Sequence, residues 1–117
     1  MANEITITAK IKCTNGELIV PESGVVRLSI DQATQGYFAD VIGTTTTFAD
    51  LPASVTAPGM TYFKNLDATN DIYLGTADSQ FSVKLKPGEV ALFRCHELLG
   101  HKASAGTPSL QLICLEN

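Results

Sequence analysis

The feature that most constrains the fold is a period of two in the hydrophobicity of the first segment. Over residues 4–13, polar side chains alternate with an apolar set: Ile5, Ile7, Ala9, Ile11 and Cys13. Because successive side chains of a strand point to opposite faces, this pattern predicts a β-strand with one buried and one solvated face. Asn15-Gly16 follows and favours a tight hairpin turn, since both residues tolerate positive φ.

Further alternating or β-branched segments recur along the chain, separated by turn residues such as Pro58-Gly59 and Pro87-Gly88. We expect strands in 18–20, 25–31, 37–43, 60–66, 71–75, 80–86, 89–95 and 110–115, with extended structure in 44–48 and a long loop over 96–108. In the strand at 80–86, Phe81, Val83 and Leu85 are expected to face inward. The sequence therefore predicts an all-β fold, an antiparallel β-sandwich or jelly-roll-like barrel of about 8–10 short strands. The length predicts a single domain over residues 1–117.

Charge and composition argue against several classes of function. The formal net charge of −4 disfavours a nucleic-acid backbone binder, which needs a basic face, and disfavours binding to an anionic membrane surface. The N-terminus lacks a basic stretch followed by an apolar block, and the apolar runs are short, so we expect neither a secretory signal nor a membrane span. A charged fraction of 17% is low for a freely soluble monomer and hints that part of the surface meets a partner.

The three cysteines, Cys13, Cys95 and Cys114, are odd in number, widely spaced and free of any C-x-x-C pair. Such spacing gives no disulfide framework and no zinc knuckle. We expect buried, reduced thiols that act as small hydrophobic side chains. Cys13 and Cys114 could be neighbours if their strands pair.

Two groups of residues invite a metal-binding interpretation, and the spacing disfavours both. His96 and His101 stand five residues apart, whereas the zinc-protease helix needs histidines four apart, so we expect an exposed loop here. Oxygen ligands for calcium occur in two neighbouring turns, at Asp67, Asn70, Asp71 and Asp78, but without the EF-hand spacing. These are ordinary β-turn residues. With no catalytic set readable either, we expect no metal, no cofactor and no enzymatic activity.

Aromatic residues fall mostly in expected strands, where core packing is the default. Tyr62 and Phe63 are adjacent and must point to opposite faces, so one of them could pack against a neighbouring subunit. A sugar-binding module would need exposed aromatic residues over a shallow face, and the absence of tryptophan disfavours it.

Two stretches in the second half of the chain resemble small virion proteins of tailed bacteriophages. The first is residues 58–75, which contain Phe63-Lys64-Asn65-Leu66-Asp67-Ala68-Thr69-Asn70 followed by Ile72-Tyr73-Leu74-Gly75; the second is residues 81–94, which contain Leu85-Lys86-Pro87-Gly88-Glu89 followed by an apolar strand that ends in Arg94. Residues 1–9 are similar too, whereas residues 95–101 depart from the pattern. These motifs are strand-and-turn signatures, so they identify a scaffold rather than an active site.

The resemblance implies a virion structural protein, made in the host cytoplasm. The first hypothesis is a capsid decoration or cement protein that binds and stabilises the assembled head. Its partners would be the major capsid protein or other virion proteins. A homo-oligomer, most simply a trimer, would match the symmetry axes of a capsid. The alternatives are a neck, tail or fibre component and, more distantly, a carbohydrate- or host-surface-binding module.

The N-terminal segment is the candidate partner interface. A terminal alternating strand can pair with the edge of another chain's sheet. The residues concerned are Ala2, Asn3, Glu4, Ile5, Thr6 and Ile7. The competing interpretation is that this strand pairs within its own sheet.

Overall fold

A computed structural model describes residues 5–11, 13–15, 18–20, 24–30, 32, 36–52 and 58–116. Over these residues the secondary structure is entirely β, with twelve strands and no helix, so the predicted all-β class is confirmed. It follows that the described residues contain no helix that is long and apolar enough to cross a membrane. The strands are more numerous than the 8–10 that the turn signals suggest, because the first alternating segment is divided and two further short strands form in segments expected to be irregular.

Contacts divide the chain into two compact units, residues 1–33 and residues 34–117, which we call the hairpin unit and the sandwich unit. The sequence predicts one sandwich over residues 1–117. In the structure, the sandwich is built from residues 34–117, because strands of the first 33 residues pair with one another and enter neither of the two larger sheets.

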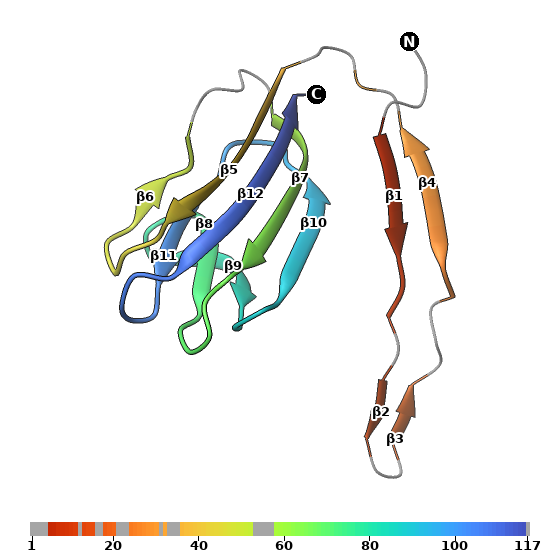
Figure 1. Ribbon diagram of the computed structural model, residues 1–117, viewed down its shortest axis with the longest axis horizontal. Helices are drawn as coiled ribbons and strands as arrows, with labels where there is room; N and C mark the ends of the chain where they lie inside the picture. The colour runs from red at the N-terminus through yellow and green to blue at the C-terminus, as the bar shows by residue number, and fades with distance from the viewer. Residues whose placement is uncertain are drawn as a thin grey trace. The chain divides into compact units, whose positions relative to one another are not determined.

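The hairpin unit consists of two antiparallel strand pairs in succession (Figure 1). Strand β1 (Ile5–Ala9) pairs with β4 (Val26–Ile30), and β2 (Cys13–Asn15) pairs with β3 (Leu18–Val20). In the first pair the apolar residues of the two strands lie directly opposite, for example Ile7 opposite Leu28. The alternation over residues 4–13 therefore predicts strand structure correctly for β1 and for Cys13.

The sandwich unit has two four-stranded antiparallel sheets that face each other (Figure 1). The first sheet has the order β10-β7-β12-β5, from Val90–Arg94, Pro58–Asn65, Ser109–Glu116 and Tyr37–Gly43. The second has the order β6-β11-β8-β9, from Ala49–Asp50, Gly100–Ala103, Ile72–Ala77 and Gln80–Leu85. Alternate residues of both sheets meet in one core, in which Phe63, Ile72, Leu74 and Leu110 are fully buried. This arrangement is the sandwich that the period-two segments predict.

Two segments differ from the sequence expectation. Residues 44–48, expected to be extended, form a bend, and the Thr44 N–H donates to the Pro108 carbonyl at 2.8 Å. Residues 96–108, expected to be a loop, contain strand β11, which pairs with β8 and β6. The polar and small residues of this segment give no alternating hydrophobic pattern that would predict the strand. Its inward residues are His101 and Ala103, of which one is polar and the other small.

The residues that carry the phage resemblance organise turns. The Asn65 side chain is fully buried; its Nδ2 donates to the carbonyls of Asn70 (2.8 Å) and Leu85 (3.0 Å), and its Oδ1 accepts from the Asp67 N–H (3.0 Å). Asp67 Oδ2 in turn accepts from the N–H groups of Asn70 and Thr69, and these hydrogen bonds lower the pKa of the Asp67 carboxyl. Asp67 is therefore a β-turn residue, as expected, and its side chain bonds the backbone of its own turn.

The second resembling stretch forms the turn at 86–89 that follows β9, and this turn is also bonded to Asn65. Gly88 adopts a φ of +80°, which favours glycine, and its N–H donates to the Asn65 carbonyl at 2.9 Å. Glu89 Oε1 accepts from the Lys86 N–H at 2.8 Å. Both stretches therefore meet at Asn65, which ties the end of β7 to the turns at 67–70 and 86–89.

Candidate functional site

The predicted partner interface lies at the start of the hairpin unit. Ala2, Asn3 and Glu4 fall outside the described residues. Ile5, Thr6 and Ile7 lie in β1 and pair with Ile30, Ser29 and Leu28 of β4. One edge of β1 is thus paired within the chain, as the competing interpretation expects, while the other edge borders no further strand among the residues described. Strand addition to a partner at that second edge stays a prediction.

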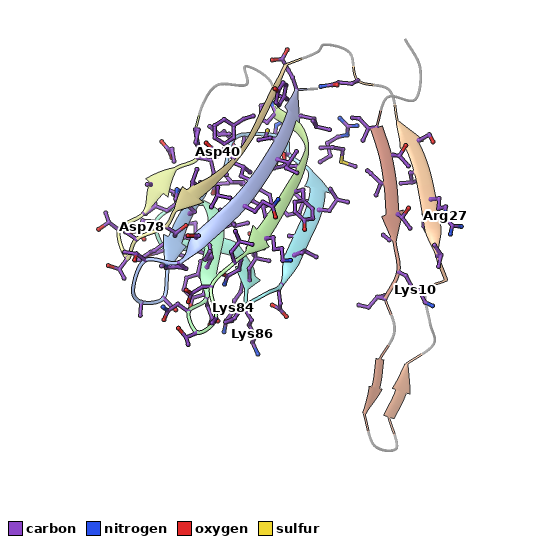
Figure 2. All side chains as sticks on the ribbon, in the orientation of Figure 1. Lys10, Arg27, Asp40, Asp78, Lys84 and Lys86 are labelled. Carbon is purple, nitrogen blue, oxygen red and sulfur yellow. The ribbon has the colours of Figure 1, made fainter. Side chains whose placement is uncertain are left out.

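The hairpin unit also exposes apolar side chains. Val25, Val26 and Leu28 are each 47% exposed, and Ile11 is 73% exposed. The charged side chains Lys10 and Arg27 are carried by the same ribbon (Figure 2). A two-stranded ribbon is at best marginally stable in water by itself. Exposed apolar side chains on such a ribbon are therefore suited to contact with another surface.

A second apolar surface lies on the outer face of the first sheet. In the registers of β5, β12, β7 and β10, four apolar residues fall side by side in a row across the whole sheet: Ala39, Ile113, Tyr62 and Leu92. We call this the apolar row. Tyr62 lies on this outer face, whereas Phe63 is fully buried. The two adjacent residues therefore point to opposite faces of the strand, as predicted. Val90 and Tyr37 lie on the same face and are 55% and 67% exposed.

The two histidines of the 96–101 segment do not form a common site. His96 is exposed, whereas His101 is 6% exposed and lies in β11, so the expected exposed loop is wrong for His101. Its Nδ1 lies 2.9 Å from Thr44 Oγ1, which joins β11 to the bend at 44–48. Burial lowers the pKa of His101, and the nearby Asp50 carboxylate partly opposes that shift. Burial of His101 therefore favours the neutral form of its imidazole.

The acidic residues of the two turns have other partners. Asp67 is hydrogen-bonded within its own turn, Asp71 lies 3.6 Å from Lys84, and Asp78 lies 3.1 Å from Lys102. Throughout the part of the chain that the structure describes, no three His, Cys, Asp or Glu side chains form a group that could hold a metal ion.

Two of the three cysteines lie in the core. Cys95 and Cys114 are free thiols and both are buried, as their strands predict. The Thr61 hydroxyl donates to Cys114 Sγ at 3.5 Å. Burial raises the pKa of the Cys95 thiol, a shift that a hydrogen bond with Thr61 partly opposes. We expect Cys13 and Cys114 to be neighbours only if their strands pair. Strand β2, which holds Cys13, pairs with β3, whereas β12, which holds Cys114, pairs with β5 and β7, so this pairing does not occur.

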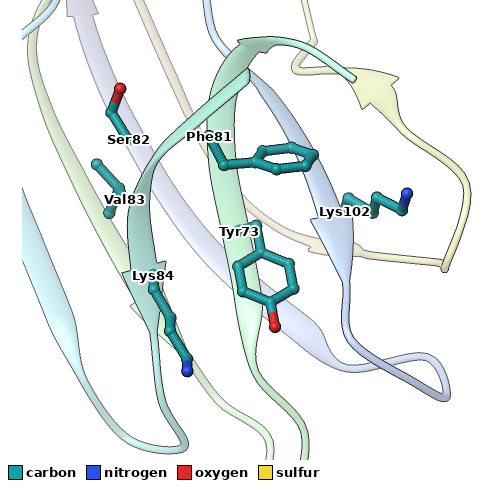
Figure 3. A pocket seen from close by; sticks show the side chains of 6 residues that line it. All are labelled: Tyr73, Phe81, Ser82, Val83, Lys84 and Lys102. Atoms are coloured by element: carbon teal, nitrogen blue, oxygen red, sulfur yellow. The ribbon is translucent and has the colours of Figure 1, made fainter. Parts of the chain in front are cut away.

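A pocket of about 390 Å³ lies on the outer face of the second sheet (Figure 3). Its lining residues are Tyr73, Phe81, Ser82, Val83, Lys84 and Lys102. Tyr73 points outward because its neighbours Ile72 and Leu74 are fully buried. The ring centroid of Phe81 lies 5.6 Å from that of Tyr73 and 6.1 Å from that of Phe48. We call this site the aromatic pocket.

Phe81 reaches the pocket because of a β-bulge, which corrects its predicted inward orientation. Leu74 pairs with Val83, but the next residue, Gly75, pairs with Phe81, so Ser82 is an extra residue in β9. The bulge moves Phe81 to the face of Tyr73, while Val83 still packs on the core as predicted. A Cβ on Gly75 would clash with the backbone of residues 80 and 81. A glycine inside a strand is the sequence signal that could have indicated this bulge.

Two lysines flank the aromatic pocket at fixed register positions. Tyr73 of β8 pairs with Lys84 of β9 on one side and with Lys102 of β11 on the other. Figure 3 shows the two side chains on either side of the Tyr73 ring. Each lysine has its own carboxylate partner, Asp71 or Asp78, so the charge of both lining ammonium groups is compensated by a neighbour.

Neither a family model, nor a curated protein, nor a solved structure matches this chain. The described surface is distinguished by three physical features: an apolar two-stranded hairpin, the apolar row and the aromatic pocket. The first two are suited to contact with protein, and the third is a hollow of the size and chemistry of a small-molecule site.

Proposed function

We propose that this chain is a structural protein of a phage virion, of the decoration or cement type, that binds the assembled head and stabilises it. The observation that carries the proposal is the hairpin unit, a two-stranded ribbon that exposes Val25, Val26 and Leu28. A ribbon of this kind gains stability when another chain covers its face or extends its edge. The resemblance of residues 63–94 to small virion proteins supports the virion as the setting.

The edge of β1 that borders no further strand among the described residues gives the proposal its mechanism. A strand of the coat that pairs along this edge would add several backbone hydrogen bonds, each worth about 1 kcal/mol net. Burial of the exposed parts of Val26 and Leu28 would add about 25 cal/mol for each Å² of apolar surface removed from water. Such a contact is weak in one copy, but many copies on one shell add up to a large stabilisation.

The apolar row offers the second contact that a cement needs. We propose that a neighbouring copy of the same chain covers it, most simply in a trimer, so that the hairpin remains available to the major capsid protein or to another virion protein. The four residues of the apolar row carry no charge, so two copies can meet over the row without placing like charges directly opposite each other; the cations Lys64 and Arg94 lie on the same face outside it.

Removal and add-back of the protein test the proposal. Particles that lack it should assemble but rupture sooner on heating, and the purified full chain should bind mature heads and restore their resistance, because a ligand specific for the mature lattice stabilises it by mass action. Heads that stay stable while tails are missing or adsorption fails would contradict the cement role and favour the neck, tail or fibre alternative.

A matched pair of substitutions tests the hairpin contact itself. Leu28→Lys on the hairpin and Leu66→Lys on the sandwich change leucines of similar exposure, 47% and 44%. Leu28→Lys should weaken rebinding to heads by about tenfold or more, since it replaces apolar burial with a charge. Leu66→Lys should rebind like the unchanged chain. Deleting Ala2 to Ile7 should also weaken rebinding, whereas His96→Ala should not; equal rebinding by all variants would exclude the hairpin as the contact.

A further inference from the structure

We propose that the aromatic pocket is a binding site for a neutral saccharide, with one pyranose ring stacked on Tyr73 and Phe81. The inference does not rest on the virion role, because it follows from a different surface of the sandwich unit. The pocket volume of about 390 Å³ lies in the lower part of the range of about 300–1,000 Å³ that is typical of small-molecule sites.

The floor of the pocket matches one face of a pyranose. Tyr73 and Phe81 line the pocket with their rings tilted by 36° to each other, and Phe48 packs on Phe81 at a tilt of 53°; together the three rings form an apolar strip on the outer face of the second sheet. A pyranose presents a face of C–H bonds that packs on such rings, and its burial there removes apolar surface of both partners from water. The strip is half-buried, so its rings are held in place while one side of it remains accessible.

Two glycines make room for the aromatic strip. Gly100 and Gly75 lie opposite each other in β11 and β8. A Cβ on Gly100 would overlap the Phe48 ring, so that ring rests directly on the backbone of β11. Gly100 therefore leaves room for the Phe48 ring beside the pocket, and Gly75 leaves room for the bulged backbone that brings Phe81 to the outer face.

The rim selects for hydroxyl groups over an anion. Lys84 is paired with Asp71 at 3.6 Å and Lys102 with Asp78 at 3.1 Å. Ammonium groups donate hydrogen bonds and carboxylates accept them, and a sugar hydroxyl can satisfy both kinds of group at once. An anionic ligand would instead have to compete with Asp71 for Lys84 and with Asp78 for Lys102. The balanced charge thus favours a neutral polyol over a phosphate or a nucleotide.

Direct titration tests the site. The full chain is titrated by saturation-transfer NMR and calorimetry with maltose, cellobiose, lactose and N,N′-diacetylchitobiose, and in parallel with AMP and inorganic phosphate. We expect at least one neutral saccharide to bind with an affinity that 0.5 M NaCl, about a 4 Å screening length, leaves unchanged. Binding of AMP or phosphate alone with strong salt dependence, or no binding of any of the four saccharides, would overturn the proposal.

Variants locate the binding on the pocket. Tyr73→Ala should weaken saccharide binding by about tenfold, the equivalent of one lost ring contact. Tyr37→Ala, a tyrosine that is 67% exposed on the other sheet, is the matched control and should bind normally. Tyr73→Leu keeps apolar packing and tests the ring if the alanine variant does not fold, and Lys102→Met removes one rim donor. Saccharide binding that is unchanged in Tyr73→Leu and Lys102→Met would place the ligand elsewhere and refute the site.

Discussion

Replacement of Asn65 by alanine removes three hydrogen bonds at one fully buried position. The amide donates to the carbonyls of Asn70 and Leu85 and accepts from the Asp67 N–H, at 2.8, 3.0 and 3.0 Å. Each hydrogen bond contributes about 1 kcal/mol net, so the free energy of unfolding should fall by about 3 kcal/mol. The loss is large because three backbone groups, in Asp67, Asn70 and Leu85, lose the side chain that bonds them, and the bond to Leu85 is buried.

Urea denaturation followed by circular dichroism measures this loss. With a dependence of about 1–3 kcal/mol per molar urea for small proteins, the midpoint should fall by roughly 1–3 M. Asn70→Ala is the control, since it keeps the backbone carbonyl that accepts from Asn65. Its free energy of unfolding should change by less than about 1 kcal/mol. Equal midpoints for Asn65→Ala and the unchanged protein would refute the role assigned to this side chain.

Three further predictions concern the sandwich unit. Gly100→Ala should destabilise the protein by about 1–3 kcal/mol, because the new Cβ overlaps the Phe48 ring. Gly43→Ala is the control and should leave the melting temperature nearly unchanged, because a Cβ there meets nothing within 4 Å. Similar melting temperatures for the two variants would contradict this packing. Acid should destabilise the protein through His101, because burial lowers the pKa of the folded imidazole below 6.5, so the unfolded chain binds the proton first as the pH falls. His101→Gln should flatten the fall of the urea midpoint between about pH 7 and pH 5, and an unchanged slope would argue against it. Cys95 and Cys114 should react slowly with a thiol reagent until denaturant is added, since both are buried; fast native labelling of both would disprove their core positions.

Period-two alternation predicts the strands of this chain well where the buried side chains are large and apolar. Strand β12 is an example: Leu110, Leu112 and Cys114 are predicted to share a face, and all three are buried. The same reasoning fails for β11, whose inward residues are His101 and Ala103. A small residue and a histidine carry little hydrophobic signal, and the burial of His101 depends on a hydrogen bond from a segment far away in the chain.

The aromatic pocket could not be predicted from local pattern because it depends on register. Strict alternation places Phe81 in the core with Val83 and Leu85, and one extra residue in the strand moves it to the outer face. The division into two units could not be predicted either, because alternation indicates that a strand forms but not which strand it pairs with. The exposed apolar side chains of the hairpin become visible only once β1 is seen to pair with β4.

A cryo-EM reconstruction of the intact particle tests the assembly proposal most directly. The proposal predicts density for the sandwich unit at repeated positions over the outer surface of the head, with the hairpin strands β1 and β4 in contact with coat subunits. A backbone strand of the coat along the edge of β1 opposite β4 would be the specific mark of that contact. Density confined to one vertex, the neck or the tail, or a hairpin that points into solvent on the head, would contradict it.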